Sequence, residues 1–147
     1  MAQTTEAQNF KMSHQNGRLA LVVDDEATSL LILSSMLEAQ AMSVKCAKSA
    51  DEMEVMLRAN DFDVIFLDYK LGKIDGLELL GKIVGAFPRI KVVMITAHAS
   101  IDLAVQAMHG GASGFITVPL KDLKRRDLFN APRFQQVASI TAIFIGY

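Results

Sequence analysis

The chain has 147 residues, of which 51% are hydrophobic and 21% are charged, and its formal net charge at pH 7 is −1. This length and composition suit one domain with a substantial hydrophobic core, and they exclude a chain that is disordered throughout. The near-neutral charge gives no overall basic field, so we expect no direct binding to nucleic acid.

Neither a membrane span nor a secretory signal is expected from the sequence. The longest apolar runs fall far short of the ~20 residues needed to cross a bilayer, and residues 1–17 lack the apolar core of a signal peptide. A single cysteine, Cys46, excludes an intrachain disulfide framework and a zinc site built from several cysteines. We therefore expect a cytoplasmic protein that does not bind membranes, with Cys46 as a small core residue in a strand.

In chain order, short apolar runs alternate with segments of helical periodicity. Residues 1–17 are polar and aperiodic, which predicts a flexible leader. Near-continuous apolar runs predict strands buried on both faces, and these cover residues 19–23, 42–47, 62–67, 90–95 and 115–118. Apolar residues at helical spacing predict a helix after each strand, over residues 30–37, 50–57, 77–84, 101–108 and 120–128.

Small polar residues stand where the first two helices are expected to begin. Thr28 or Ser29 is available at the start of the first helix, and Ser49 is placed to cap the second. The segment between Asp68 and the third helix is predicted to be a polar loop.

The strand–helix unit repeats about five times, which predicts an α/β fold with a parallel sheet and helices on both faces. Right-handed crossovers place the carboxyl ends of all the strands along one edge of such a doubly wound sheet. Ligands of open parallel sheets bind at that edge. The residues that follow the strands are therefore the candidate functional residues.

Acidic residues follow two of the predicted strands. The first strand ends at Asp24-Asp25-Glu26 and the third at Asp68, while Thr96 follows the fourth. One Asp after a strand is usually a turn or helix-cap residue, but several carboxylates at one edge repel each other and need a cation to stay ionised. Mg²⁺ prefers carboxylate, water and phosphate oxygens, so the pattern predicts a magnesium site.

Five motifs in this sequence resemble the response-regulator receiver domain of two-component signalling. They are the run Leu21–Glu26, the run Val64–Asp68, the segment Lys73–Leu79, the pair Thr96–Ala97 and the segment Gly111–Phe115. The resemblance predicts a receiver domain over about residues 18–129, after the leader of residues 1–17. For the extension of residues 130–147, an extra strand, a packed helix, a self-association surface and the cut end of a longer protein all remain open.

The resemblance implies a flavodoxin-like (βα)5 fold with five parallel strands in the order 2-1-3-4-5. It implies that Asp68 accepts a phosphoryl group from a histidine kinase or a phosphotransfer protein. Asp24, Asp25, Asp68 and the backbone carbonyl of Lys70 would hold Mg²⁺. The resemblance also implies a signalling module and not an enzyme.

A conformational switch is implied as well. Thr96 would bind a phosphoryl oxygen through its hydroxyl, the small Ala97 would leave room for the group, and Phe115 would rotate inward as Thr96 shifts. A downstream protein or a second copy of the domain would then bind at the face formed by the fourth helix, the fifth strand and the fifth helix.

Two residues depart from the family pattern. The family has a Lys immediately before the Pro that follows the fifth strand, and here that residue is Val118, which supplies no charge. Lys70 or Lys73 is a better candidate than Lys121 to replace the missing cation. Gly72 stands where the family usually has Pro, and we expect it to loosen its loop.

Two other functions stay open. The uncharged Val118 favours a receiver-like interaction module that binds its partners without phosphate. A Mg²⁺-dependent phosphatase with an Asp nucleophile is disfavoured, because such enzymes usually carry a second Asp two residues after the nucleophile, where this chain has Lys70.

Overall fold

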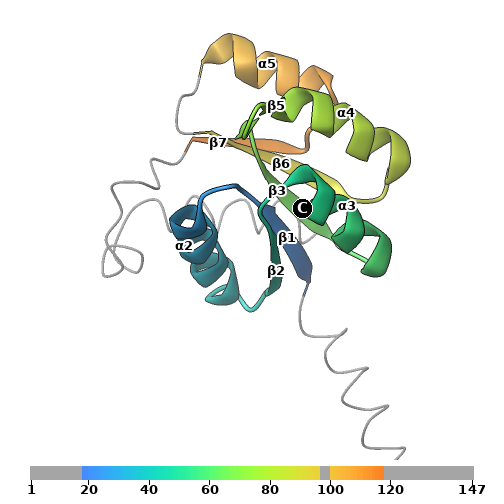
Figure 1. Cartoon of the computed structure of the whole chain (residues 1–147). Helices are drawn as coiled ribbons and strands as arrows, with labels where there is room; N and C mark the ends of the chain where they lie inside the picture. Colours follow the sequence, from blue (N-terminus) through green and yellow to red (C-terminus); the bar gives the residue numbers. More distant parts are fainter. Residues whose placement is uncertain (1–17, 97–99, 118–147) are drawn as a thin grey trace, which may run out of the picture.

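A computed structural model describes residues 18–96 and 100–117 of the chain. Within these residues, five parallel strands form one sheet in the order β2-β1-β3-β6-β7 (Figure 1). The five strands are β1 (Leu19–Val23), β2 (Ser43–Ala47), β3 (Val64–Asp68), β6 (Lys91–Thr96) and β7 (Gly114–Thr117). In strand number this is the order 2-1-3-4-5, so the predicted fold is confirmed.

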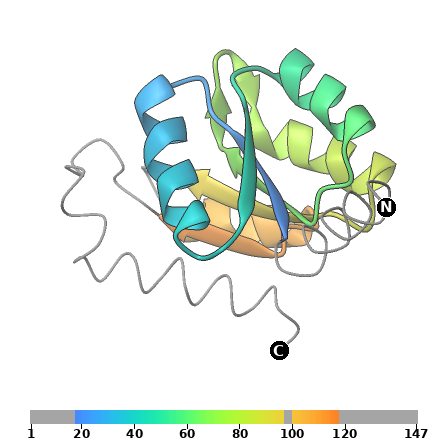
Figure 2. The ribbon, with the colours of Figure 1, turned by 90° about the horizontal axis from the view of Figure 1, so that it is seen from below.

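Four helices of the described residues connect these strands and cover the sheet. They are α2 (Ala27–Glu38), α3 (Ala50–Ala59), α4 (Gly76–Ala86) and α5 (Ile101–His109). Helix α2 packs on one face of the sheet, while α3, α4 and α5 contribute buried side chains to the other face. Figure 2 shows the sheet between α2 on one side and α3 and α4 on the other. The predicted fifth helix, residues 120–128, lies outside the described residues.

Alternate residues of the central strands enter two separate cores. In β3, Val64 and Phe66 pack in the α2 core, whereas Ile65 and Leu67 pack in the opposite core. All four are at most 1% exposed. This period of two follows from strand geometry, and burial on both faces explains why the strand reads as a continuous apolar run.

Local signals identified the N-cap residue of α3 but not that of α2. As predicted, Ser49 caps α3, and its side chain accepts a hydrogen bond from the Glu52 backbone N–H. Thr28 and Ser29 lie in the first turn of α2, near its start as predicted, but neither is the N-cap residue, which is Glu26 and makes no side-chain cap bond. Only residues 24–26 separate β1 from α2, and within them Asp24 Oδ1 accepts a hydrogen bond from the Glu26 N–H at 2.9 Å.

The segment after β3 is a hairpin and not the loosened loop that Gly72 was expected to cause. Two short antiparallel strands, β4 (Lys70–Leu71) and β5 (Ile74–Asp75), pair directly across it. Gly72 has a φ of +62°, a conformation that glycine adopts without steric cost. The glycine therefore allows an ordered turn here.

Cys46 is exposed, so its prediction as a core residue was wrong. Its strand, β2, forms one edge of the sheet and pairs only with β1 among the described strands. The Cys46 Sγ atom lies 3.1 Å from Ser34 Oγ of α2. An apolar sequence alone does not distinguish an edge strand from a central one, which explains the error.

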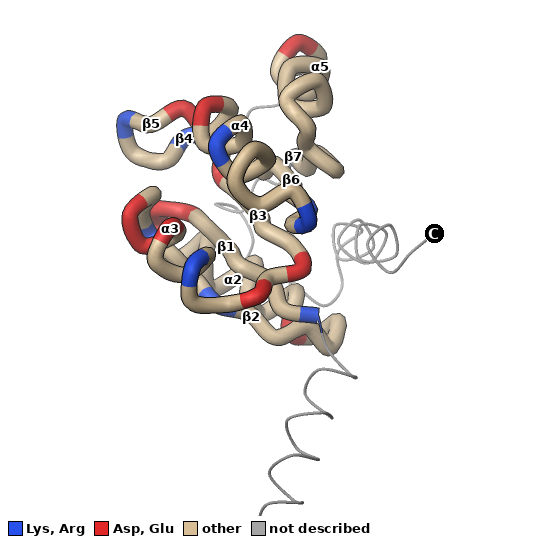
Figure 3. The backbone as a smooth tube through the Cα atoms, turned by 90° about the vertical axis from the view of Figure 1, so that its right-hand side faces the viewer, with Lys and Arg blue, Asp and Glu red and all other residues tan. Residues whose placement is uncertain are grey.

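Charged side chains are distributed over several elements of the described fold. Figure 3 shows Lys and Arg at scattered positions along the tube and the β4–β5 hairpin projecting beside α4. None of the described helices has the length and apolar character that would let it span a membrane.

Candidate functional site

Three carboxylates meet at the carboxyl end of the sheet. Asp24 and Asp25 follow β1, and Asp68 is the last residue of β3. Because β1 and β3 pair in parallel, with Val23 opposite Leu67, the residues that follow are brought side by side. One oxygen from each of the three aspartates lies within 4.8 Å of the others. The convergence predicted from the strand ends is therefore present, without Glu26, which is not part of this group.

Burial and mutual repulsion shift the protonation of this cluster. The pKa of Asp24 is raised to about 7, mainly by burial and in smaller part by the charges of Asp68 and Asp25. Burial also raises the pKa of Asp68, with the charge of Asp25 adding to the shift. The backbone N–H groups of Glu26 and Lys70 oppose these shifts. The cluster is thus an anionic site whose full ionisation is unfavourable without a compensating charge.

The donor set fits a hard divalent cation. It consists of carboxylate oxygens only, which Mg²⁺ and Ca²⁺ prefer over nitrogen or sulfur. A cation at this position would offset the repulsion that raises the pKa of Asp24 and Asp68. Asp24 and Asp68 are partly buried and Asp25 is exposed, so the site is open to solvent on one side.

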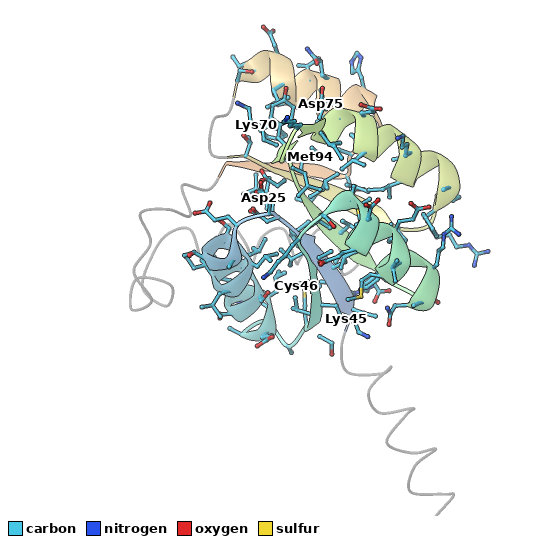
Figure 4. All side chains as sticks on the ribbon, viewed as in Figure 1. Asp25, Lys45, Cys46, Lys70, Asp75 and Met94 are labelled. Atoms are coloured by element: carbon cyan, nitrogen blue, oxygen red, sulfur yellow. The ribbon has the colours of Figure 1, made fainter. Side chains whose placement is uncertain are left out.

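The β4–β5 hairpin closes one side of the cluster. The Lys70 N–H lies 3.4 Å from Asp68 Oδ1, and the Gly72 N–H donates to Asp25 Oδ2 at 3.2 Å. Figure 4 shows Asp25 and Lys70 near the same end of the sheet. In a hairpin with a two-residue turn, the backbone groups of the residue pair next to the turn bond to each other across the hairpin. The N–H and C=O groups of the following pair point away from the partner strand. Lys70 belongs to this second pair, so its carbonyl lies on the same edge of the hairpin as the N–H that points to Asp68.

Helix α4 begins in close contact with the end of β3. Asp75 caps the helix by accepting a hydrogen bond from the Leu77 N–H at 2.8 Å. The Gly76 N–H donates to the Tyr69 carbonyl at 2.7 Å. A Cβ on Gly76 would lie only 2.7 Å from the carbonyl oxygens of Asp68 and Tyr69, so a side chain does not fit there.

Thr96 and Phe115 lie on the paired strands β6 and β7, and β6 is the strand next to β3, which ends at Asp68. Thr96 is the last residue of β6, one position beyond the pairing of Asp68 with Ile95, and is 5% exposed. Phe115 of β7 pairs with Met94 and packs, partly buried, against the core under α3, α4 and α5. Ala97 and Val118, the other two predicted site residues, lie outside the described residues.

Three features of the site were not predicted from the sequence. They are the cap by Asp75, the close approach at Gly76 and the hydrogen bond between Gly72 and Asp25. An Asp before a Gly at the start of an apolar helical pattern is a recognisable cap signal and would have identified the first. The other two depend on contacts between separate segments, for which the sequence gives no local signal.

Comparison with protein families gives one match over most of the chain. A model of the response regulator receiver domain matches residues 20–132. Among curated proteins, the alginate biosynthesis transcriptional regulatory protein AlgB of Pseudomonas aeruginosa is 39% identical over 107 residues, which are 73% of this chain and 24% of that protein. The transcriptional regulatory protein ZraR of Escherichia coli K12 is 32% identical over 109 residues, 74% of this chain and 24% of that protein. The chain thus spans about a quarter of the length of these relatives.

Solved structures share the same fold. A response regulator from Thermotoga maritima superposes with a TM-score of 0.66 at 26% identity, covering 80% of this chain and 97% of that one. A response regulator from Burkholderia pseudomallei, solved with a phosphorylated aspartic acid, a calcium ion and citrate, gives a TM-score of 0.64 at 26% identity. That match covers 86% of this chain and 74% of the other.

Proposed function

The chain belongs to the response regulator receiver domain family of two-component signalling, and from this premise we propose that Asp68 is its phosphoacceptor. The family is a signalling module rather than an enzyme and implies a histidine kinase as partner. The observation that carries the proposal is the position of Asp68 at the end of a central strand, with Asp24 and Asp25 within reach of the same ion. The phosphorylated aspartic acid of the Burkholderia protein supports the same chemistry.

In the proposed reaction a carboxylate oxygen of Asp68 attacks the phosphorus of a phosphohistidine on a kinase or phosphotransfer protein. The new bond joins that oxygen to phosphorus, the phosphorus–nitrogen bond breaks, and its electron pair returns to the imidazole. Asp68 is partly buried at an open edge, so the acceptor oxygen is accessible while the surrounding strands hold it in place. Thr96, on the neighbouring strand, then donates its hydroxyl to a phosphoryl oxygen.

Asp24, Asp25, Asp68 and the Lys70 carbonyl are the proposed ligands of Mg²⁺. When bound, the ion reduces the repulsion between the acceptor carboxylate and the phosphoryl oxygens. The chain's own part is to gather these oxygens from β1, β3 and β4. We propose the cytoplasm as the setting, because the free, exposed Cys46 suits a reducing compartment.

Phosphorylation is tested by incubating the protein with acetyl phosphate and measuring its intact mass. We expect the mass of one added phosphoryl group with Mg²⁺ and none with a chelator. Asp68→Asn removes the nucleophile and abolishes the increase. Asp61→Asn, which changes an exposed aspartate before β3, is the matched control and keeps it.

The second candidate function is a receiver-like interaction module that works without phosphate. The uncharged Val118 favours it, because a phosphoryl group there lacks the usual Lys partner. A wild-type protein that takes up no phosphoryl group from acetyl phosphate or a kinase, and gains none through Val118→Lys, would contradict the first function and favour this second one.

Helix α5, which is the fourth of the predicted helices, carries the surface that we propose for self-association after phosphorylation. Ile101, Val105 and Met108 are 84%, 48% and 50% exposed, and their spacing places them along one side of the helix. Exposed apolar side chains in a row are typical of protein-binding surfaces. This row lies on the helix that packs beside β7, where Phe115 sits, so a change at Phe115 is close enough to alter it.

The role of this surface is tested by measuring the mass of the phosphorylated protein in solution by light scattering. We expect dimers for the wild type and monomers for Ile101→Lys, because a charge in the row opposes burial. Leu31→Lys changes an exposed leucine of α2 on the other side of the sheet and is the control. Dimers that persist in Ile101→Lys, or that Leu31→Lys also removes, would contradict this surface.

A further inference from the structure

The turn of the β4–β5 hairpin does not use the backbone N–H of Gly72. Gly72 and Lys73 are its two central residues, and Gly72 has a φ of +62° while Lys73 is not among the residues with positive φ. A positive φ at the first central position only, with Gly there, is the pattern of a type II′ turn. Such a turn uses the N–H of its fourth residue, so the N–H of Gly72 is free to bond elsewhere.

That free donor points to the aspartate cluster. The Gly72 N–H donates to Asp25 Oδ2 at 3.2 Å, across a sequence separation of 47 residues. Two positions earlier, the Lys70 N–H faces Asp68 Oδ1 at 3.4 Å. Alternate residues of an extended strand direct their backbone groups to the same edge. The N–H groups on one edge of the hairpin therefore face two carboxylates, which follow different strands of the sheet.

We propose that Gly72 is a positioning residue of the metal site, which holds Asp25 in its ligating orientation through the backbone N–H. The inference rests on the proposed metal site and deepens it. Asp25 is the exposed member of the three aspartates, so it has the most rotational freedom to lose when an ion binds. A hydrogen bond to one carboxylate oxygen restricts that freedom and leaves the other oxygen for the ion, as second-layer partners of metal ligands do.

The same bond also positions the hairpin. The proposed ligand carbonyl of Lys70 lies on β4, and its distance from Asp25 depends on how the hairpin is placed over β1. The Gly72–Asp25 bond ties these two parts together. It thus brings a backbone ligand and a side-chain ligand, separated by 45 positions in the sequence, into one arrangement before the ion arrives.

Position 72 has two requirements, a positive φ and an N–H group. Proline, the usual residue of the family here, meets neither, because its ring fixes φ near −65° and it has no N–H. Asn keeps the N–H and tolerates positive φ better than other non-glycine residues. A Cβ at Gly72 meets no atom within 4 Å, so the Asn side chain has space, and the cost of this substitution is the backbone strain of a side chain at φ +62°. Gly72→Pro and Gly72→Asn are therefore a matched pair.

The test measures Mg²⁺ affinity by calorimetric titration of the full chain, without any phosphoryl donor. We expect Gly72→Pro to bind Mg²⁺ about 10-fold or more weakly than the wild type, in the range found for loss of second-layer partners. Gly72→Asn stays within about 3-fold of the wild type, since it retains the donor. Equal or tighter binding by a folded Gly72→Pro, or an equal loss in both variants, would overturn the proposal.

A second measurement keeps the test valid if Gly72→Pro does not fold. In the wild type, the amide proton signal of Gly72 is observed by NMR and compared with that of Asp25→Ala. We expect an upfield shift and faster exchange of this amide in Asp25→Ala, because its acceptor is gone. An unchanged Gly72 amide would overturn the hydrogen bond itself. A wild type that binds no Mg²⁺ would instead contradict the proposed metal site, so the two failures are distinguishable.

Discussion

At the scale of single residues, Asp24 is the aspartate whose ionisation is most clearly opposed by burial. Its carboxyl lies partly buried beside two other carboxylates, and burial is the main cause of a pKa near 7. In the unfolded chain its pKa is near 3.8. The folded protein therefore binds a proton at Asp24 between about pH 4 and pH 7 that the unfolded chain has already released.

This difference fixes the sign of the pH dependence. Because the folded state binds more protons, the contribution of Asp24 is fully present below about pH 4 and is lost as the pH rises through about 7. With a chelator present, the free energy of unfolding of the wild type should fall over this interval relative to that of Asp24→Asn. Urea unfolding of both proteins at several pH values measures it.

At pH 8 without metal, we expect Asp24→Asn to be more stable than the wild type by on the order of 1 kcal/mol, since the amide removes a charge from the cluster and the site is partly solvated. Excess Mg²⁺ should reverse this order, because only the carboxylate is a strong ligand. Asp61→Asn serves as the control, and parallel pH curves for wild type and Asp24→Asn would show that Asp24 ionises normally.

At the scale of secondary-structure elements, the start of α4 determines how closely a helix approaches the end of β3. Asp75 caps the helix, and Gly76 brings its first turn against the backbone of Asp68 and Tyr69. The absence of a side chain at Gly76 is a requirement of this contact. Helix α4 also contains Gly81, where a Cβ would meet no atom within 4 Å.

Replacement of these two glycines by alanine should change the free energy of unfolding in opposite directions. Gly76→Ala places a Cβ 2.7 Å from backbone atoms, so we expect a loss of about 1–3 kcal/mol in the free energy of unfolding. Gly81→Ala should add about 0.5–1 kcal/mol, because alanine has the higher helix propensity and the space is open. Urea denaturation of both variants tests this, and equal effects would contradict the close approach.

At the scale of the whole molecule, the metal site joins segments that are distant in sequence. The aspartates come from the ends of β1 and β3, and the β4–β5 hairpin bonds to both. The unfolded chain does not hold these groups together, so an ion that binds them binds the folded state preferentially. Cation binding and folding are therefore coupled.

Mg²⁺ should accordingly raise the unfolding temperature, and a chelator should remove the gain. At a free concentration ten times the dissociation constant, the expected gain is about 1.4 kcal/mol. The gain should be larger at pH 8 than at pH 6, because protons compete with the ion for Asp24, whose pKa is about 7. Calorimetric scans at constant ionic strength measure both effects. Asp25→Ala is the control, and its unfolding temperature should not change with Mg²⁺. A wild type whose unfolding temperature does not change with Mg²⁺ would exclude the proposed metal site.

The sequence by itself determined the five strands of the parallel sheet, their alternation with helices and the cap at Ser49, because each depends on apolar runs, periodicity or a side chain close in the sequence. It also placed Asp24, Asp25 and Asp68 at one edge, since parallel strands end on the same side.

Only the tertiary structure decided the exposure of Cys46, the contact at Gly76 and the bond from Gly72 to Asp25. The first depends on which strand forms the edge of the sheet, and the second on the distance between a helix and a strand. The third joins two segments 47 positions apart. Distances of this kind are set by how the elements pack together, and short-range patterns in the sequence do not contain them.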